Sequence, residues 1–452
     1  MQPLFFDEAL LPQGFARSVR VMIEGGLIAR VESGATAGPS DERHAIGLPG
    51  MPNLHSHAFQ RGMAGLAELR GPASDSFWTW REVMYRFAHG MGPDDVEAVA
   101  AELYVEMLEA GFTRVGEFHY LHHDKDGAPY ADLAEMAGRI AAAAETTGIG
   151  LTLLPVFYAH GGFGGVAPAP GQRRFVNDLD GFARLLEGAR GAVARLGAGV
   201  VGVAPHSLRA ATRDELVALI PLAQLGPIHI HVAEQMKEVE DCLAWSGMRP
   251  VEWLLAHIPV DRAWCLIHAT HMTESERDAM AKAGAVAGLC PITEANLGDG
   301  IFDAAGFVAA GGEYGVGSDS NVLVALPDEL RQLEYSQRLR HRARNVLARG
   351  EGSSTGRALY EAALAGGSHA LGVPKAGIRE GAPADLVSLE ADHPALVARQ
   401  GDALLDGFVF AARDRLIDCV WRGGRKLVEN GRHRERDACL ARFKSVMARL
   451  LA

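Results

Sequence analysis

The sequence predicts an α/β fold, a (β/α)8 barrel of the TIM type with a small β-sandwich domain formed by both termini. Three observations indicate it. Eight short apolar runs rich in β-formers alternate with helical stretches through the middle of the chain. Most of these runs end in histidines or carboxylates, where such barrels keep their chemistry. Glycine-turn patterns flank the alternation at both ends of the chain.

The two flanks are expected to form one domain. Residues 1–47 contain RSVRVMIEGGLIARVES, two alternating runs around a Gly-Gly pair, which is typical of a β-hairpin. Residues 374–433 contain GAPADLVSLE and DCVWRGGRKLVENGR, again short runs around glycine turns. We therefore expect a β-sandwich domain from both flanks, a barrel over 48–373 and a closing amphipathic helix over 434–452.

The barrel strands are expected where β-rich runs end in polar residues. The expected strands are 48–57, 112–120, 149–159, 200–207, 227–234, 263–271, 285–293 and 314–320. Helical stretches such as DDVEAVAAELYVEMLEAG and RDELVALIPLAQ lie between them. The alternative is a doubly wound open sheet, which the lack of a GxGxxG turn at any strand end disfavours. The Gly-rich segment 161–174 follows the third strand, and we expect a long substrate loop or lid there.

Composition excludes several classes of protein. The chain has 452 residues, 48% of them hydrophobic and 22% charged, and no apolar run long enough for a transmembrane helix. Its start lacks the pattern of a signal peptide, and its five scattered cysteines form no CxxC pair, so a reducing cytoplasm is expected. The net charge of −12 argues against nucleic acid or an anionic membrane as a partner.

Polar residues at the strand ends are the candidate site. In chain order they are His55, His57, Glu117, His119, Tyr120, His206, His229, His231, Glu234, His268, His271, Thr293, Glu294, Asn296 and Asp319. Side chains two apart on a strand point the same way, so His55 and His57 can face one centre. Alone, a histidine at a strand end is more often a hydrogen-bonded structural residue than a metal ligand. The joint pattern of HxH, HxxE, a further histidine and SD suits Zn²⁺, with Fe²⁺ also feasible.

This joint pattern resembles the amidohydrolase superfamily over nearly the whole chain, including MIEGGLIARV and GAPADLVSLE where the superfamily has its small β-sandwich. The resemblance implies that the metal ligands are His55, His57, His231 and Asp319. It also implies that His268 contacts the metal-bound water and that Glu234 shuttles protons. Dinuclear members carry a carboxylated lysine at the end of strand four. VVGVAPHS has none, so we expect one metal.

The neighbouring histidines are weaker candidates for the centre. His229 points the same way as His231 but lies deeper in its strand, so we expect a structural role. His271 lies past its strand end and is disfavoured against His268.

The expected chemistry is hydrolysis of a C–N bond. Metal coordination lowers the pKa of water from about 16 to about 7, so a hydroxide forms at neutral pH and adds to an sp² carbon that bears nitrogen. Asp319 or His268 would take the water proton, and Glu234 would protonate the departing nitrogen so that ammonia leaves. The alternative for Glu234 is a solvated acid that opens the helix EQMKEVEDCLAW, where it would suit the helix dipole.

A second set of motifs resembles a narrower group, the deiminases of histidine breakdown that convert the formimino group of an acidic amino acid to a formyl group. The motifs are LPGMPNLHSHAFQRGMAGLAE, SFWTWREVMY, GEFHYLHH, APHSLRA, HVAEQ, HATHMT, CPITEANLGDG and GSDSN. The resemblance implies that the substrate is held by Gln60, Arg81, Tyr120, His206 and Arg209. Two carboxylates call for guanidinium groups, which bind them bidentately. We expect Arg81 in a loop formed by the aromatic segment FWTWREVMY after the first strand. Alone, each arginine is typical of a surface salt bridge, and the aromatic segment is typical of a loop packed onto the barrel rim.

Two other functions compete with this interpretation. A related mononuclear aminohydrolase could act on a nucleobase or similar ring, as guanine and cytosine deaminases do, but it would need aromatic stacking and amide contacts rather than two arginines. A barrel that has lost catalysis and serves in assembly would have lost ligands, and none is missing here. For the family a homodimer is expected.

Overall fold

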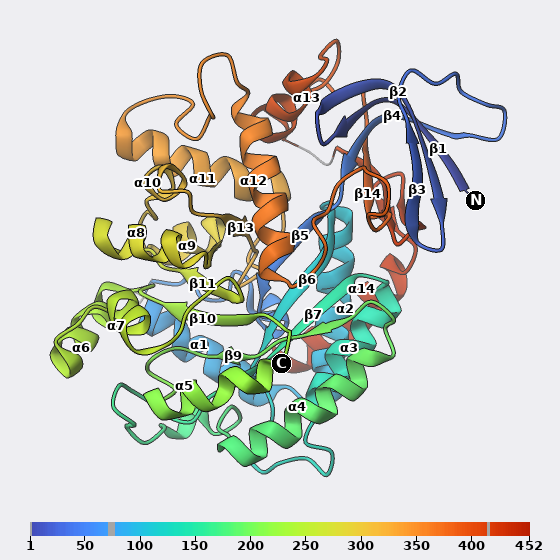
Figure 1. The fold of residues 1–452 in the computed structure, drawn as a ribbon. Coiled ribbons are helices and arrows are strands. Elements are labelled where there is room, and N and C mark those ends of the chain that lie inside the picture. The colour runs from blue at the N-terminus through green and yellow to red at the C-terminus, as the bar shows by residue number, and fades with distance from the viewer. Residues whose placement is uncertain (1, 71–76, 414–415) are drawn as a thin grey trace.

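The computed structural model describes residues 2–70, 77–413 and 416–452, with helices arranged around a central set of parallel strands (Figure 1). The central strands are β5 (Met51–Ser56), β6 (Phe112–His119), β7 (Gly150–Phe157), β8 (Val200–Val201), β9 (Ala204–Pro205), β10 (Ile228–Val232), β11 (Trp264–His268), β12 (Val286–Leu289) and β13 (Tyr314–Val316). Each expected barrel strand has a counterpart, and the fourth is broken into β8 and β9.

Two parallel sheets make up the barrel and meet along two seams. Strands β5 to β9 form one sheet, and β10 to β13 form the other. Parallel bridges join Ser56 to Asp319 at one seam and Ser207 to His231 at the other. The ring of strands therefore closes, which confirms the predicted barrel against the open doubly wound sheet.

The first expected strand, 48–57, is divided between two sheets. Strand β4 (Glu42–Pro49) carries Leu48 into the sheet of the terminal regions, and β5 begins after Gly50. A Cβ atom on Gly50 would lie 2.3 Å from the side chain of Thr113. The chain changes sheets here because only glycine lets it pass so close to β6.

Helices cover the outside of the barrel. They are α1 (Phe77–Gly90), α2 (Pro93–Glu109), α3 (Glu135–Thr147), α4 (Leu179–Ala194), α5 (Arg213–Leu219), α6 (Met236–Ser246), α7 (Pro250–His257), α8 (Glu274–Ala283), α9 (Pro291–Leu297), α10 (Ala304–Ala309), α11 (Leu326–His341) and α12 (Thr355–Ala370). Local signals set their starts. Before α5, Thr212 donates its backbone N–H to Glu215 at 2.7 Å, which closes a capping box.

The terminal regions share one sheet, at the upper right of Figure 1. Its order is β17 (Arg432–His433), β16 (Arg425–Glu429), β15 (Ile417–Arg422), β14 (Leu386–Leu389), β4, β1 (Gln2–Leu11), β2 (Gly14–Glu24) and β3 (Leu27–Glu32). The expected hairpin turns at Gly25 and Gly26, whose φ angles of 58° and 82° suit glycine. The sheet is curled, and the rings of Phe6 on β1 and Trp421 on β15 lie 6.5 Å apart. One continuous sheet therefore encloses the hydrophobic core that we expected between the two sheets of a β-sandwich.

Two further helical segments lie near the C-terminus. Residues 402–411, in a region expected to hold short strands, instead form α13 (Asp402–Asp406) and a following helical turn (Gly407–Ala411). Helix α14 (Arg436–Leu450) packs along α2, where Arg436 pairs with Glu102 and Glu109. Within the described ranges, every helix is too short or too polar to cross a membrane.

Candidate active site and metal centre

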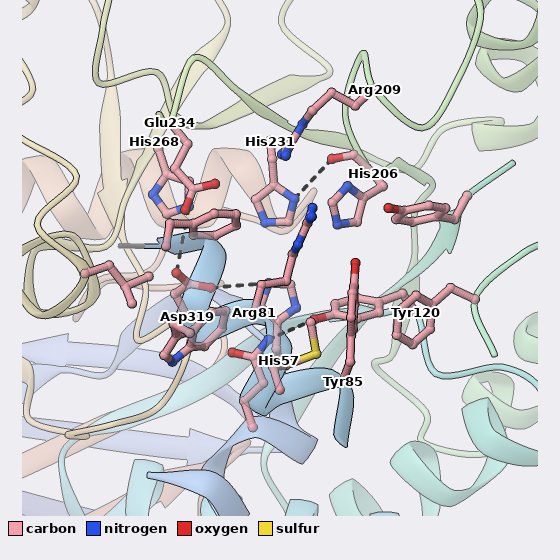
Figure 2. A pocket seen from close by; sticks show the side chains of 17 residues that line it. His57, Arg81, Tyr85, Tyr120, His206, Arg209, His231, Glu234, His268 and Asp319 are labelled. Atoms are coloured by element: carbon pink, nitrogen blue, oxygen red, sulfur yellow. Dashed lines mark hydrogen bonds and ion pairs between the residues drawn. The ribbon is translucent and has the colours of Figure 1, made fainter. Parts of the chain in front are cut away.

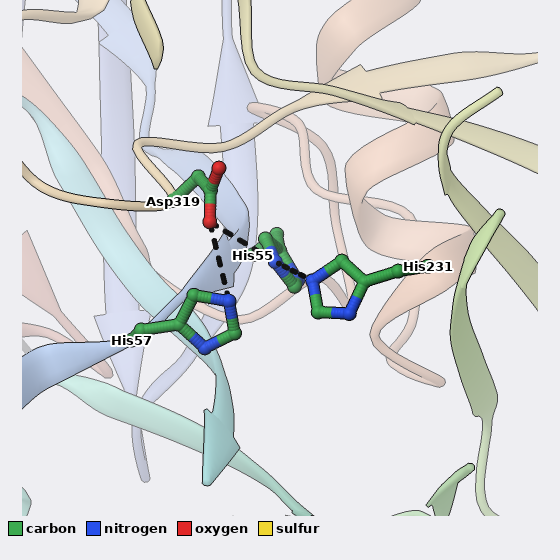
Figure 3. A group of neighbouring side chains, drawn as sticks. All are labelled: His55, His57, His231 and Asp319. Carbon is green, nitrogen blue, oxygen red and sulfur yellow. Dashed lines mark hydrogen bonds and ion pairs between the residues drawn. The ribbon is translucent and has the colours of Figure 1, made fainter. Parts of the chain in front are cut away.

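Three histidines and an aspartate meet at the carboxyl ends of the barrel strands (Figure 3). His55 lies on β5 and His57 directly after it, His231 lies on β10, and Asp319 follows β13. One ligand atom from each residue lies within 4.8 Å of every other, and all four side chains are buried. The closed barrel therefore brings together residues that are up to 264 positions apart in the chain.

The hydrogen bonds of the histidines suit a metal ion. The Nδ1 atoms of His57 and His231 lie 2.9 Å from the carbonyl of Phe118 and 3.0 Å from that of His206, so each must carry a proton and donate. Each ring then presents the lone pair of Nε2 to the centre. The centre thus gathers imidazole nitrogens and the Asp319 carboxylate, which is the donor chemistry of Zn²⁺.

Strained backbone positions the last ligand. Asp319 has a φ of 46°, a left-handed conformation that residues other than glycine rarely adopt. The amide of Asp319 donates to the carbonyl of His55 at 2.9 Å, and the amide of His57 donates to the carbonyl of Asp319 at 3.0 Å. The side chain of Asn321 also donates to the carbonyls of His57 and Asp319. These bonds fix the carboxylate opposite the two histidines of β5.

His268 lies between three carboxylates. Its Nε2 atom is 3.8 Å from Glu234 and 3.7 Å from Asp319, and its Nδ1 atom is 3.2 Å from Glu294. Burial lowers the pKa of His268, but the carboxylate of Glu234 and the contact with Glu294 outweigh it and raise this pKa to about 10. Sequence analysis named Glu294 at a strand end without giving it a role.

Glu234 is a buried acid in the turn before α6. It lies ahead of the helix, whose N-cap is Gln235, so the alternative of a solvated acid opening the helix is wrong. Burial raises the pKa of Glu234 to about 7. The backbone amides of Ala233 and Glu234 both donate to the buried carboxylate of Glu238 at 3.2 Å. Glu238 therefore holds the turn that aims Glu234 at His268.

One pocket contains all the expected substrate residues together with part of the metal centre (Figure 2). The expected substrate residues in its lining are Gln60, Arg81, Tyr120, His206 and Arg209. His57, His231, Glu234, His268 and Asp319 line it too. One local prediction was wrong, because Arg81 lies on helix α1 and not in a loop.

Several polar atoms in this pocket have no protein partner. The Nε atom of Arg209 and the Oε1 atom of Gln60 are buried without a hydrogen bond. Among the described residues, neither Arg81 nor Arg209 forms an ion pair with a carboxylate. Unpartnered buried donors cost free energy unless a ligand satisfies them. The pocket thus presents an unpartnered donor of Arg209 and an unpartnered acceptor of Gln60 beside the histidine and aspartate cluster.

Other pocket residues escaped sequence analysis. Tyr158 follows β7, within the expected strand 149–159, so the strand-end rule could have found it. Tyr85 lies one turn after Arg81 on α1 and becomes visible only once the helix is known. Gln172 of the segment 161–174 donates to the hydroxyl of Tyr158, which ties that loop to the pocket wall.

The remaining histidines lie outside the pocket lining. The Nε2 atom of His229 donates to the carbonyl of Ala370 at 2.7 Å inside the barrel, in keeping with a structural role. His271 lies beyond β11, and its backbone amide donates to the carbonyl of Ala233 at 3.0 Å. Neither side chain reaches the ligand cluster.

The fold and the site together define a class of protein, a barrel hydrolase with a histidine and aspartate centre at its strand ends. Residues 46–427 match the model of the amidohydrolase family, so the chain belongs to this family, as its motifs predicted. Residues 1–45 match the model of the N-terminal domain of the formimidoylglutamate deiminase HutF.

Individual relatives narrow the comparison. The chain is 50% identical over 453 residues to the formimidoylglutamate deiminase of Pseudomonas aeruginosa, and the match covers 100% of both chains. The crystal structure of an amidohydrolase from Brucella melitensis superimposes with a TM-score of 0.97 at 61% identity and covers 100% of both chains. A zinc-bound adenosine deaminase from Xanthomonas campestris shares the fold, with a TM-score of 0.83, 19% identity and coverage of 100% and 98%. The predicted resemblance to the formimino deiminases is confirmed.

Proposed function

We propose that the protein is a zinc-dependent deiminase of histidine degradation that hydrolyses N-formimino-L-glutamate to N-formyl-L-glutamate and ammonia. The full-length identity to the deiminase of Pseudomonas aeruginosa supports the reaction. The pocket supports the substrate, because it places two arginines beside a cluster of three histidines and an aspartate. A substrate with an amidine-type carbon and two carboxylates matches this pocket, because the carbon would face the metal cluster and the carboxylates would face the two arginines.

The observation that carries the proposal is the unpartnered guanidinium of Arg209. Its Nε atom is buried without a hydrogen bond, and Arg81 lies in the same pocket without a carboxylate partner among the described residues. A nucleobase has no charge to pair with these two partly buried guanidinium groups, whereas a dicarboxylate can pair with both. The side-chain amide of Gln60 donates from Nε2 to the hydroxyl of Tyr120 at 2.8 Å. Its Oε1 atom has no protein partner and could accept a hydrogen bond from an N–H group of the substrate.

The metal would be held by His55, His57, His231 and Asp319. When bound there, Zn²⁺ supplies a water of lowered pKa and polarises the carbon–nitrogen group. Glu234, buried and 3.8 Å from His268, is placed to carry a proton to the departing nitrogen, so that ammonia and not an amide anion leaves. Asp319 would take the proton released from water, and the charged ring of His268, 3.7 Å from that carboxylate, would contact the water and stabilise the carboxylate.

One metal per chain is part of the proposal. The fourth strand ends in His206, so no lysine stands where a second ion would need a carboxylated ligand. We propose a homodimer in the cytoplasm as the working state of the enzyme.

Ammonia release from zinc-loaded protein tests the function. N-formimino-L-glutamate, guanine and cytosine are supplied separately at equal concentration, and ammonia and N-formyl-L-glutamate are both measured. We expect equimolar ammonia and formylglutamate from the first substrate only. Ammonia from a nucleobase, with none from formiminoglutamate, would replace the proposal with a ring deaminase.

A further inference from the structure

Two guanidinium groups of the pocket meet over one indole ring. The Cζ atom of Arg81 lies 4.5 Å from the ring centroid of Trp78, and that of Arg209 lies 5.6 Å from it. Arg81 comes from α1 and Arg209 from the loop after β9, and Figure 2 shows both side chains reaching into the same part of the pocket. Elements far apart in sequence thus bring two cations to one aromatic ring.

Like charges repel, and the carboxylates of Glu238 and Glu234, which lie near Arg209 without pairing with it, offset part of that repulsion. Among the described residues, neither guanidinium has a carboxylate in ion-pair contact. The face of an indole ring is negative and attracts cations, most strongly where water is partly excluded. Trp78 is therefore placed to hold both arginines in the pocket before an anion arrives.

The two arginines depend on Trp78 to different degrees. Arg81 lies three residues after Trp78 on the same helix and also has the ring of Tyr85 5.5 Å from its Cζ atom. For Arg209, the indole of Trp78 is the aromatic face in cation contact among the described residues. The Nζ atom of Lys237 lies 5.9 Å from the same ring, so a third cation shares it. Loss of the indole should therefore release Arg209 first.

We propose that Trp78 is a positioning residue that sets the preference for ligands with two carboxylates. Its indole ring spaces the guanidinium groups of Arg81 and Arg209 so that each binds one carboxylate of the same ligand. The inference rests on the proposed function for the identity of the substrate, but not for the geometry of the two cations. The lining of the pocket contains Arg81, Arg209, Glu234 and part of the metal cluster but not Trp78, so loss of the indole should weaken ligand binding more than turnover.

Binding of the two-carboxylate product tests the role without turnover. N-formyl-L-glutamate and N-formylglycine, which has one carboxylate, are titrated calorimetrically into zinc-loaded wild type, Trp78→Phe and Trp78→Leu. We expect Trp78→Leu to weaken formylglutamate binding about fivefold to thirtyfold, the size of two partly buried cation–π contacts, and formylglycine binding much less. Trp78→Phe, which keeps an aromatic face, should fall between wild type and Trp78→Leu.

Turnover gives the second readout. With N-formimino-L-glutamate, Trp78→Leu should raise KM by a similar factor and leave kcat within about twofold of wild type. Trp245→Leu removes the same ring from the exposed surface of α6, outside the pocket, and reports the general cost of losing a tryptophan.

Three results would overturn the inference. They are equal weakening for both ligands, a fall in kcat alone, and binding by Trp78→Phe as weak as by Trp78→Leu. If Trp78→Leu does not fold, the test uses Trp78→Phe alone. The ratio of its dissociation constants for formylglutamate and formylglycine is then compared with the same ratio for wild type. Failure of the proposed function looks different, because wild type would then release no ammonia from formiminoglutamate while the two-carboxylate preference and its dependence on Trp78 persisted.

Discussion

The Nε2 atoms of His55 and His231 lie 3.1 Å apart in the barrel. Burial lowers the pKa of His55 to about 3 and that of His231 well below its usual range, so both rings are neutral. The Nδ1 proton of His231 is committed to the carbonyl of His206, which leaves a lone pair on Nε2. The Nε2 atoms of both rings converge beside the carboxylate of Asp319, which lies 3.4 Å from the Nε2 atom of His55, an arrangement that a cation stabilises.

Metal removal should expose this dependence. We expect about one equivalent of zinc per chain, and its removal by a chelator should abolish turnover and lower the melting temperature. The stabilisation at a thousandfold excess of free zinc over Kd is about 4 kcal/mol, and it disappears with the metal. Metal content by emission spectroscopy and melting by calorimetry check both effects.

Substitution of a single ligand gives the matched test of the centre. His231→Asn should retain well under one equivalent of zinc, whereas His271→Asn, outside the ligand cluster, should retain it in full. Stoichiometric zinc in His231→Asn would place the metal elsewhere. Two equivalents in wild type would contradict the single-metal proposal.

Glu234→Gln should separate proton transfer from metal binding. The variant keeps the shape of the side chain and its place near His268, but it cannot donate a proton to the leaving nitrogen. We expect kcat to fall about 10²-fold to 10⁴-fold with zinc content unchanged. The exposed Glu240→Gln on α6 is the control, and its kcat should match wild type. Loss of zinc from Glu234→Gln would mean that Glu234 supports the metal centre instead.

The barrel was predictable because each strand has a recognisable local sequence pattern. Each is a short apolar run that ends in polar residues, and a closed ring then places those polar ends together. The division of the first expected strand at Gly50 was not predictable. Its cause is the approach of Thr113, a contact that exists only after the sheets have formed. The curl that brings Phe6 to Trp421 has the same long-range origin.

The strand-end histidines, Glu234 and Asp319 could be identified as site candidates from the sequence, because they lie where the apolar runs end. Residues that only hold other site residues in place could not be identified from the sequence. Asn321 and Glu238 hold backbone groups of the site, and no local pattern distinguishes them from ordinary polar residues. The aromatic segment that contains Arg81 is amphipathic with a helical period, and its helix was missed because the segment was assigned to a loop. The meeting of Arg81 with Arg209 over Trp78 required the complete fold.

Arg209→Met should remove one carboxylate anchor. Since the Nε atom of Arg209 is buried without a protein partner, we expect it to bind a ligand, and loss of Arg209 should raise KM about tenfold to a hundredfold with a smaller change in kcat. Arg209→Lys keeps the charge but not the planar fork, so it should recover only part of the affinity. Steady-state kinetics with N-formimino-L-glutamate measure both variants. An unchanged kcat/KM in Arg209→Met would show that this arginine is outside the substrate site.

Docking of α14 on α2 should make stability depend on pH through Glu102. This carboxylate pairs with Arg436, yet burial raises its pKa to about 7, above its value of about 4.5 in the unfolded chain. The folded protein therefore binds the proton more tightly, and the stabilisation present below pH 4.5 is lost as the pH rises through 7. Glu102→Gln, which does not titrate, should show a smaller fall in urea midpoint between pH 5 and pH 8 than wild type or the exposed Glu145→Gln. An equal fall in all three proteins would assign the pH dependence to other groups.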